Sequence, residues 1–267
     1  MIRDITLGQY YQTKSPIHSL DPRTKLIGTL LYIISLFIVD NLIGYLVAAL
    51  FLVVCISLSK VPFKFIVRGM KAILFLLIIA AVFNVLLTPG EVIWSWWKLK
   101  ITKEGIEMAV KMTVRLCFLI LGSSIMTLTT TPNNLTDGLE SVMKPLKIFK
   151  VPVHEIAMMM TIALRFVPIL LEETDRIMKA QMARGVDFES GGLIKKAKSL
   201  VPLLVPLFIS AFRRANDLAM AMEARCYKGG EGRTKMKPLK YKRVDVIAYL
   251  VLLIYFAVII VTKIMIK

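Results

Sequence analysis

Two arginines, each near the end of a helix-compatible run, have the residue types and spacing that best suit a specific chemistry. Arg184 and Arg225 lie 41 residues apart. Their shared pattern is Ala183-Arg184-Gly185 in the first copy and Ala224-Arg225-Cys226 in the second. Small neighbours leave a guanidinium unobstructed, so its planar fork can enter a groove on a partner and bind a carboxylate through two hydrogen bonds. The alternative is that each cation only stabilises the last turn of its helix, by roughly 0.3–1 kcal/mol. The duplication favours binding.

Other chemistry is poorly represented in the sequence. It contains no G-x-x-x-x-G-K-[ST] phosphate loop, no G-x-S-x-G and no H-E-x-x-H. Its two histidines, His18 and His154, are interpreted as surface residues. The three cysteines, Cys55, Cys117 and Cys226, show no metal-binding spacing. We therefore predict no catalytic residue, no metal site and no disulfide.

The composition points to a membrane. The chain has 267 residues, of which 57% are hydrophobic, yet its formal net charge is +17. Apolar runs bracketed by basic residues are typical of membrane spans with basic cytoplasmic segments. Nucleic acid is the other common partner of a basic chain, but no nucleic-acid-binding module is recognisable, so we predict none.

Five apolar runs are predicted to cross the bilayer, which requires roughly 17–25 residues of helix. They lie at residues 26–39, 42–58, 72–87, 113–128 and 244–261. Basic residues at 60–71 and 235–243 place these loops and the N-terminus in the cytoplasm by the positive-inside rule. Trp94, Trp96 and Trp97 follow the third run and resemble an interfacial aromatic belt.

Residues 131–243 are predicted to form a separate helical domain. A short helix is expected at 133–149, and a long one from Val151-Pro152 to Arg184, bent at Pro168. A third helix is expected from Lys195 to Arg225, broken by two prolines, Pro202 and Pro206. Two further spans are the alternative, but residues 200–212 are too few to cross comfortably, so cytoplasmic or interfacial helices are preferred. The predicted domains are 1–130, 131–243 and 244–267.

Three segments carry a resemblance to a known family. They are residues 20–26, reading Leu-Asp-Pro-Arg-Thr-Lys-Leu; residues 163–168 with Glu172 and 180–185; and residues 223–227, reading Glu-Ala-Arg-Cys-Tyr. With the membrane runs, the chain resembles over essentially its whole length the transmembrane T component of energy-coupling factor (ECF) transporters, the EcfT/CbiQ family. Cys226 departs from the glycine of the first copy and suggests that the two ends meet non-identical partners.

The resemblance implies an all-α membrane protein with about five transmembrane helices and a cytoplasmic coupling domain, in a bacterial or archaeal cell membrane. It implies a non-catalytic scaffold that links two cytoplasmic ABC ATPases of the EcfA type to a membrane substrate-binding S component for uptake of vitamins or other micronutrients. ATP and magnesium would be bound by the ATPases and not by this chain. Arg184 and Arg225 would insert into grooves on the ATPases.

Secondary roles are expected along the long helices. Pro168, Pro202 and Pro206 are hinge candidates, and Met158 and Met159 are candidates for S-component contact, because methionine surfaces repack against different partners. Ordinary core filling is the alternative for each methionine. Two other functions remain open from the residues alone. One is a membrane-embedded enzyme acting on lipid or prenyl substrates, and the other is a stand-alone carrier.

Overall fold

The structure, a computed structural model, describes residues 10–96, 99–188, 192–230, 232 and 234–265. It divides into two compact units. Residues 10–141 with 239–265 form one, called here the span unit, and residues 142–238 form the other, called the long-helix unit. The prediction made for Trp97 lies outside the described residues.

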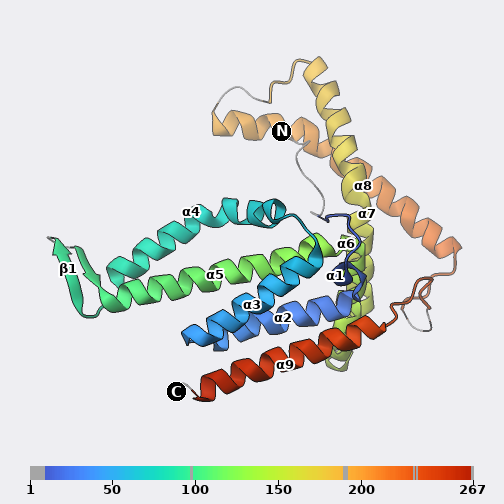
Figure 1. The fold of residues 1–267 in the computed structure, drawn as a ribbon. Helices are drawn as coiled ribbons and strands as arrows, with labels where there is room; N and C mark the ends of the chain where they lie inside the picture. The colour runs from blue at the N-terminus through green and yellow to red at the C-terminus, as the bar shows by residue number, and fades with distance from the viewer. Residues whose placement is uncertain (1–9, 97–98, 189–191, 231, 233, 266–267) are drawn as a thin grey trace. The chain divides into compact units, whose positions relative to one another are not determined.

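Apolar helices build the span unit (Figure 1). In chain order these are α1 (Pro16–Ser19), α2 (Pro22–Ile38), α3 (Leu42–Ser59), α4 (Phe63–Leu87), α5 (Lys103–Thr129) and α9 (Arg243–Met265). Helix α2 packs against both α5 and α9, and α3 packs against the same two helices. Helix α6 (Pro132–Met143) leaves this unit toward the long-helix unit.

The core of the span unit lies where α2, α3 and α9 meet. Leu36, Ala48 and Ile259 are fully buried there. The Tyr255 ring stacks on Phe51 with centroids 4.3 Å apart, and its hydroxyl is 2.7 Å from Ser35 Oγ. A hydroxyl pair inside an apolar core satisfies both groups without water, so it fixes the register of α2 against α9.

A β-hairpin joins α4 to α5, and the sequence analysis did not predict it. Strands β1 (Val92–Trp96) and β2 (Leu99–Thr102) pair antiparallel, with Val92 opposite Thr102. Residues 92–96 are mostly β-branched and aromatic, which is typical of a strand, and Trp94 and Trp96 lie in it. Thr102 then caps α5, because its hydroxyl accepts a hydrogen bond from the Gly105 amide at 3.1 Å.

The long-helix unit consists of η2 (Lys144–Phe149), α7 (Val153–Ala183) and α8 (Leu193–Ala224). The two long helices cross each other in Figure 1. Helix α7 contains Pro168 and ends one residue before the predicted Arg184. The prediction that α8 is broken was wrong: the helix is continuous through Pro202 and Pro206. A proline removes one helical hydrogen bond, and the remaining bonds keep the helix intact.

Four helices are long and apolar enough to cross a membrane within the part of the chain that is described. They are α3, α5, α7 and α9. The predicted runs 42–58, 113–128 and 244–261 lie in three of them. The first predicted run lies in α2, which has 17 residues, and the third lies in the shorter apolar stretch Ile73–Leu87 of α4. Helix α7, predicted as cytoplasmic or interfacial, also meets the length and hydropathy requirements.

Candidate functional site

The end of α7 closes in a Schellman motif that fixes the position of Arg184. The Gly185 amide donates to the Met182 carbonyl at 3.0 Å, and the Val186 amide donates to the Gln181 carbonyl at 3.0 Å. Gly185 has φ +86°, a left-handed conformation that glycine adopts without a Cβ penalty. Arg184 is therefore the last residue before a sharp reversal of the chain, at the tip of the helix.

The end of α8 repeats this geometry bond for bond. The Cys226 amide donates to the Glu223 carbonyl at 2.8 Å, and the Tyr227 amide donates to the Met222 carbonyl at 3.0 Å. Cys226 takes the left-handed position with φ +55°. A residue with a Cβ pays roughly 1–2 kcal/mol for that conformation, so the fold holds this turn against an intrinsic preference. The sequence repeat is thus a repeat of three-dimensional structure.

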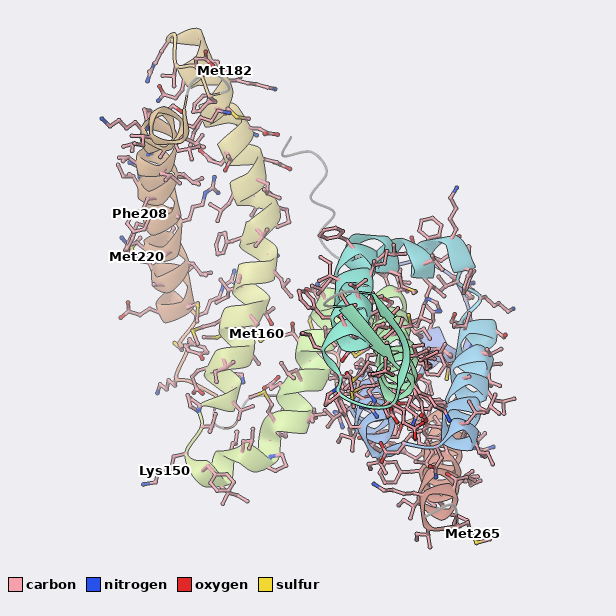
Figure 2. The ribbon with its side chains drawn as sticks, turned by 90° about the vertical axis from the view of Figure 1, so that its left-hand side faces the viewer. Lys150, Met160, Met182, Phe208, Met220 and Met265 are labelled. Atoms are coloured by element: carbon pink, nitrogen blue, oxygen red, sulfur yellow. The ribbon has the colours of Figure 1, made fainter. Side chains whose placement is uncertain are left out.

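Both arginines are exposed at these tips. Arg184, Arg225 and the preceding Ala183 and Ala224 are all solvent-exposed. Within the described residues, neither guanidinium forms an ion pair or side-chain hydrogen bond with this chain. The tip of α7 and the tip of α8 lie at different ends of this pair of helices, in both views (Figures 1 and 2). The unit therefore presents two separate, chemically similar docking points.

An ion pair joins the two long helices. Arg214 on α8 donates from Nη2 to Glu173 Oε2 on α7 at 2.8 Å, and both side chains are partly buried. These residues are also 41 positions apart, the spacing of the two tip arginines. The sequence alone did not predict this pair, because the pair depends on how α7 lies against α8. Glu173 and Arg214 each lie the same number of residues before the tip arginine of their own helix, so the bond joins equivalent positions of the two helices.

A second link uses the gap that a proline leaves in α8. Pro206 has no amide hydrogen, so the Pro202 carbonyl one turn earlier lacks its helical donor. The Gln181 side chain on α7 donates from Nε2 to that carbonyl at 3.3 Å. The same glutamine supplies the backbone carbonyl that closes the α7 tip. The tip geometry and the proline position are therefore connected through one residue.

The predicted contact residues spread along α7 and α8. Met159 and Met160 are exposed on α7 near its start, and Met158 is half-buried. Met182, Phe208 and Met220 are exposed further along, as Figure 2 shows. Apolar side chains around Phe208 and Leu170 line a shallow groove. This unit thus carries an extended apolar surface with methionines in it, a kind of surface that marks interaction sites.

In the span unit, the residue 20–26 segment forms a clamp at the start of α2. The Asp21 amide donates to Asp245 Oδ1 at 2.8 Å, and the other oxygen of Asp245 accepts from the Lys242 amide at 2.7 Å. The Lys25 ammonium donates to the Thr129 carbonyl at 2.8 Å. Asp245 and Thr129 are almost fully buried. Asp21 also caps α2, because its carboxylate accepts a hydrogen bond from the Arg23 amide at 2.9 Å.

Known proteins resemble the whole chain. Residues 13–236 match the CbiQ family, described as cobalt transport protein. The energy-coupling factor transporter transmembrane protein EcfT of Ruminiclostridium cellulolyticum is 56% identical over 247 residues, 92% of each chain. The EcfT protein of Clostridium kluyveri is 54% identical over 266 residues, 99% of this chain and 98% of its own. The EcfT protein of Bacillus subtilis is 46% identical over 256 residues, 95% and 97% of the two chains.

The helices and these similarities define a multi-pass, all-α membrane protein of the transporter class. The extent of the match then settles its relationship to known proteins. The chain belongs to the CbiQ family, which the resemblance in the sequence predicted.

Proposed function

We propose that this chain is the scaffold and energy-coupling subunit of an ECF-type importer for vitamins or other micronutrients. Two cytoplasmic ATPases bind its helix tips at Arg184 and Arg225, and a separate membrane protein, the S component, binds its substrate. The chain itself is non-catalytic, and ATP with magnesium is bound by the ATPases. Its N-terminus lies in the cytoplasm.

The observation that carries the proposal is the pair of exposed arginines at matching Schellman ends. An exposed cation on a rigid turn loses little conformational freedom when it binds a partner. Arginine can also form two parallel hydrogen bonds with one carboxylate. Two tips at different ends of this pair of helices suit two partners that move relative to each other. Nucleotide-driven closure of the ATPases would displace the tips, and α7 and α8 would transmit the motion.

The test is charge reversal at each tip. Arg184→Glu and Arg225→Glu are expected to abolish co-purification of the ATPases and uptake of a radiolabelled vitamin, because each would place a carboxylate against the partner's carboxylate. Membrane insertion, measured by the yield of the protein in the membrane fraction, should not change.

Matched controls lie on the same helices. Arg176 on α7 and Arg213 on α8 are exposed arginines away from the tips, so Arg176→Glu and Arg213→Glu should retain assembly and uptake. Normal co-purification and uptake by both tip variants would contradict the proposal. A chain that purifies alone and turns over a lipid substrate would instead favour a membrane-embedded enzyme.

The methionine surface supports a shared scaffold that accepts several S components. Met159 and Met220 are exposed on α7 and α8, and a thioether side chain repacks against different shapes. The proposal expects different S components to co-purify with this chain from cells that express several. Recovery of a single type from such cells would count against exchange.

A further inference from the structure

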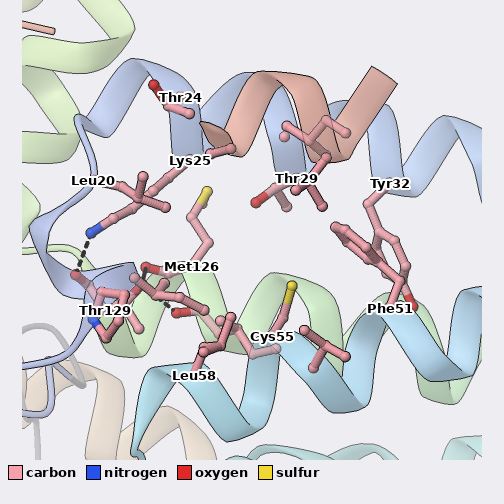
Figure 3. Close-up of a pocket in the computed structure, with 18 of the residues that line it drawn as sticks. Leu20, Thr24, Lys25, Thr29, Tyr32, Phe51, Cys55, Leu58, Met126 and Thr129 are labelled. Carbon is pink, nitrogen blue, oxygen red and sulfur yellow. Dashed lines mark hydrogen bonds between the residues drawn. The ribbon is translucent and has the colours of Figure 1, made fainter. Parts of the chain in front are cut away.

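The span unit contains an apolar cavity of about 290 Å³ that neither helix packing nor the proposed coupling role explains. Helices α2, α3, α5 and α9 wall it, and α1 closes one end (Figure 3). Its volume is near the lower end of ligand pockets, which span roughly 300–1,000 Å³. Well-packed interiors hold few voids larger than a water molecule, so a space of this size is expected to have an occupant.

The cavity opens between α3 and α9. Its lining residues on α2 and α5 are buried or partly buried, with Tyr32 and Thr129 only 3% and 2% exposed. Its lining residues near the end of α3 and the start of α9 are exposed instead, with Leu58 at 47% and Ile247 at 59%. These two helices pack closely around Ala48 and Tyr255 in the core and leave a lateral mouth beyond it.

The mouth faces lipid because both of its helices are membrane spans. Helices α3 and α9 each exceed the length and hydropathy that a bilayer crossing requires. Their exposed apolar side chains at the mouth would be in contact with hydrocarbon. A lateral opening of this kind is continuous with the acyl-chain region of the bilayer.

Most of the wall is apolar, although the buried Tyr32 hydroxyl has no hydrogen-bond partner among the described residues. Among the described lining residues, Lys25 carries the one charged group. Its ammonium donates to the Thr129 and His18 carbonyls at 2.8 and 3.4 Å, so its hydrocarbon stem faces the cavity. The Thr129 hydroxyl donates to the Ile125 carbonyl at 2.8 Å. Buried water needs two to four polar partners, and apolar cavities without them stay dry or bind apolar molecules.

We propose that this cavity binds one acyl chain of a membrane phospholipid, which enters between α3 and α9. The acyl chain fills the cavity and packs against its helix walls, beside the Asp21–Lys25 clamp. The site is independent of the two arginine tips.

Photolabelling tests the site directly. The intact protein, in nanodiscs of phosphatidylethanolamine and phosphatidylglycerol, is irradiated with a phosphatidylcholine that carries a diazirine in its acyl chain. Cross-links located by mass spectrometry are expected at interior lining residues such as Leu20, Cys55 and Met126. Val54→Trp, at the mouth, should reduce this labelling several-fold. Val53→Trp is the matched control, because Val53 is exposed on the same helix outside the lining.

A second variant with its matched control keeps the test decisive if the first variant fails to fold. Ile247→Trp closes the mouth from α9, and the neighbouring Val246→Trp faces lipid outside the lining. Equal interior labelling in all four variants, or labelling confined to outward residues such as Val53, would overturn the proposal. Loss of interior labelling when the protein is purified with its partners would also overturn it, because a protein segment would then be the occupant.

Discussion

At the scale of single residues, the two helix tips differ at one position while keeping the same backbone. Gly185 and Cys226 both adopt a positive φ, at +86° and +55°. The glycine is relaxed there and the cysteine is not. The second tip therefore has the same hydrogen bonds as the first but should open more readily.

Replacement of Cys226 by glycine is expected to stabilise the α8 tip by about 1 kcal/mol, because it removes the Cβ from a left-handed residue. Hydrogen exchange at Tyr227, whose amide is bonded to the Met222 carbonyl, should slow accordingly. Cys226→Ala is the control, since it removes the thiol and keeps the Cβ. Equal exchange in the two variants would show that backbone strain is not the cause.

His18 is expected to make the stability of the span unit depend on pH. Burial, with a smaller contribution from the Lys25 charge, lowers the pKa of His18 below its usual value of 6.5. Its Nε2 donates to the Tyr11 carbonyl at 2.9 Å, and its Nδ1, 2.7 Å from Ser15 Oγ, then accepts from that hydroxyl. The neutral ring is therefore the form that the fold accommodates.

Because the folded pKa lies below the unfolded one, this contribution to stability is present above the unfolded pKa and is lost as the pH falls. The midpoint of thermal unfolding should drop between about pH 7 and pH 5, above the range in which carboxylates titrate. His18→Gln should flatten the profile in this window. An unchanged slope in that variant would assign the effect to another group.

At the scale of elements, the sequence predicted helices well and their interruptions poorly. Five apolar runs and both long helices were predicted close to their observed positions, because a long run of apolar residues is a strong sequence signal for a membrane helix. The hairpin at Val92–Thr102 was missed because both strands are short and the first one does not alternate apolar and polar residues. The break in α8 was predicted from proline alone and did not occur.

The tips themselves could be predicted, and the links between the helices could not. Ala-Arg followed by a small residue is a local signal for a helix end. The Glu173–Arg214 pair and the Gln181 bond to the Pro202 carbonyl depend on how α7 crosses α8, which no local pattern encodes. The hinge roles of Pro168, Pro202 and Pro206 stay predictions.

The Gln181 link predicts a coupling between α7 and Pro206. Gln181→Leu should destabilise the long-helix unit by about 1 kcal/mol, because the Pro202 carbonyl loses its donor. In a Pro206→Ala background the helix supplies an amide to the same carbonyl, so Gln181→Leu should cost less. A double-mutant cycle from urea unfolding measures the difference. Strictly additive effects would show that the two residues act separately.

At the scale of the whole molecule, the clamp holds the two segments of the span unit from which the chain leads to the long-helix unit. Thr129 lies just before α6, and Lys242 lies just before α9. Both are bonded through the Asp21–Lys25 stretch and Asp245. A force arriving along either connection therefore meets the same fixed point at the start of α2.

Asp245→Ala is expected to lower the stability of the protein by roughly 2–3 kcal/mol, because the buried Asp21 amide and the partly buried Lys242 amide lose their acceptor. Thermal unfolding in detergent measures the change. Asp40→Ala is the control: Asp40 is an exposed carboxylate near Arg115 and Lys263, and its loss should cost less than about 1 kcal/mol. Similar losses from the two variants would mean that the clamp has no special role.

Cys226 has one further consequence. Of the cysteines at 55, 117 and 226, it alone is exposed, and it adjoins one tip and not the other. A thiol-reactive spin label or fluorophore would therefore mark the α8 tip and not the α7 tip in the unaltered sequence. The natural chain thus carries its own attachment point for following that end through a transport cycle.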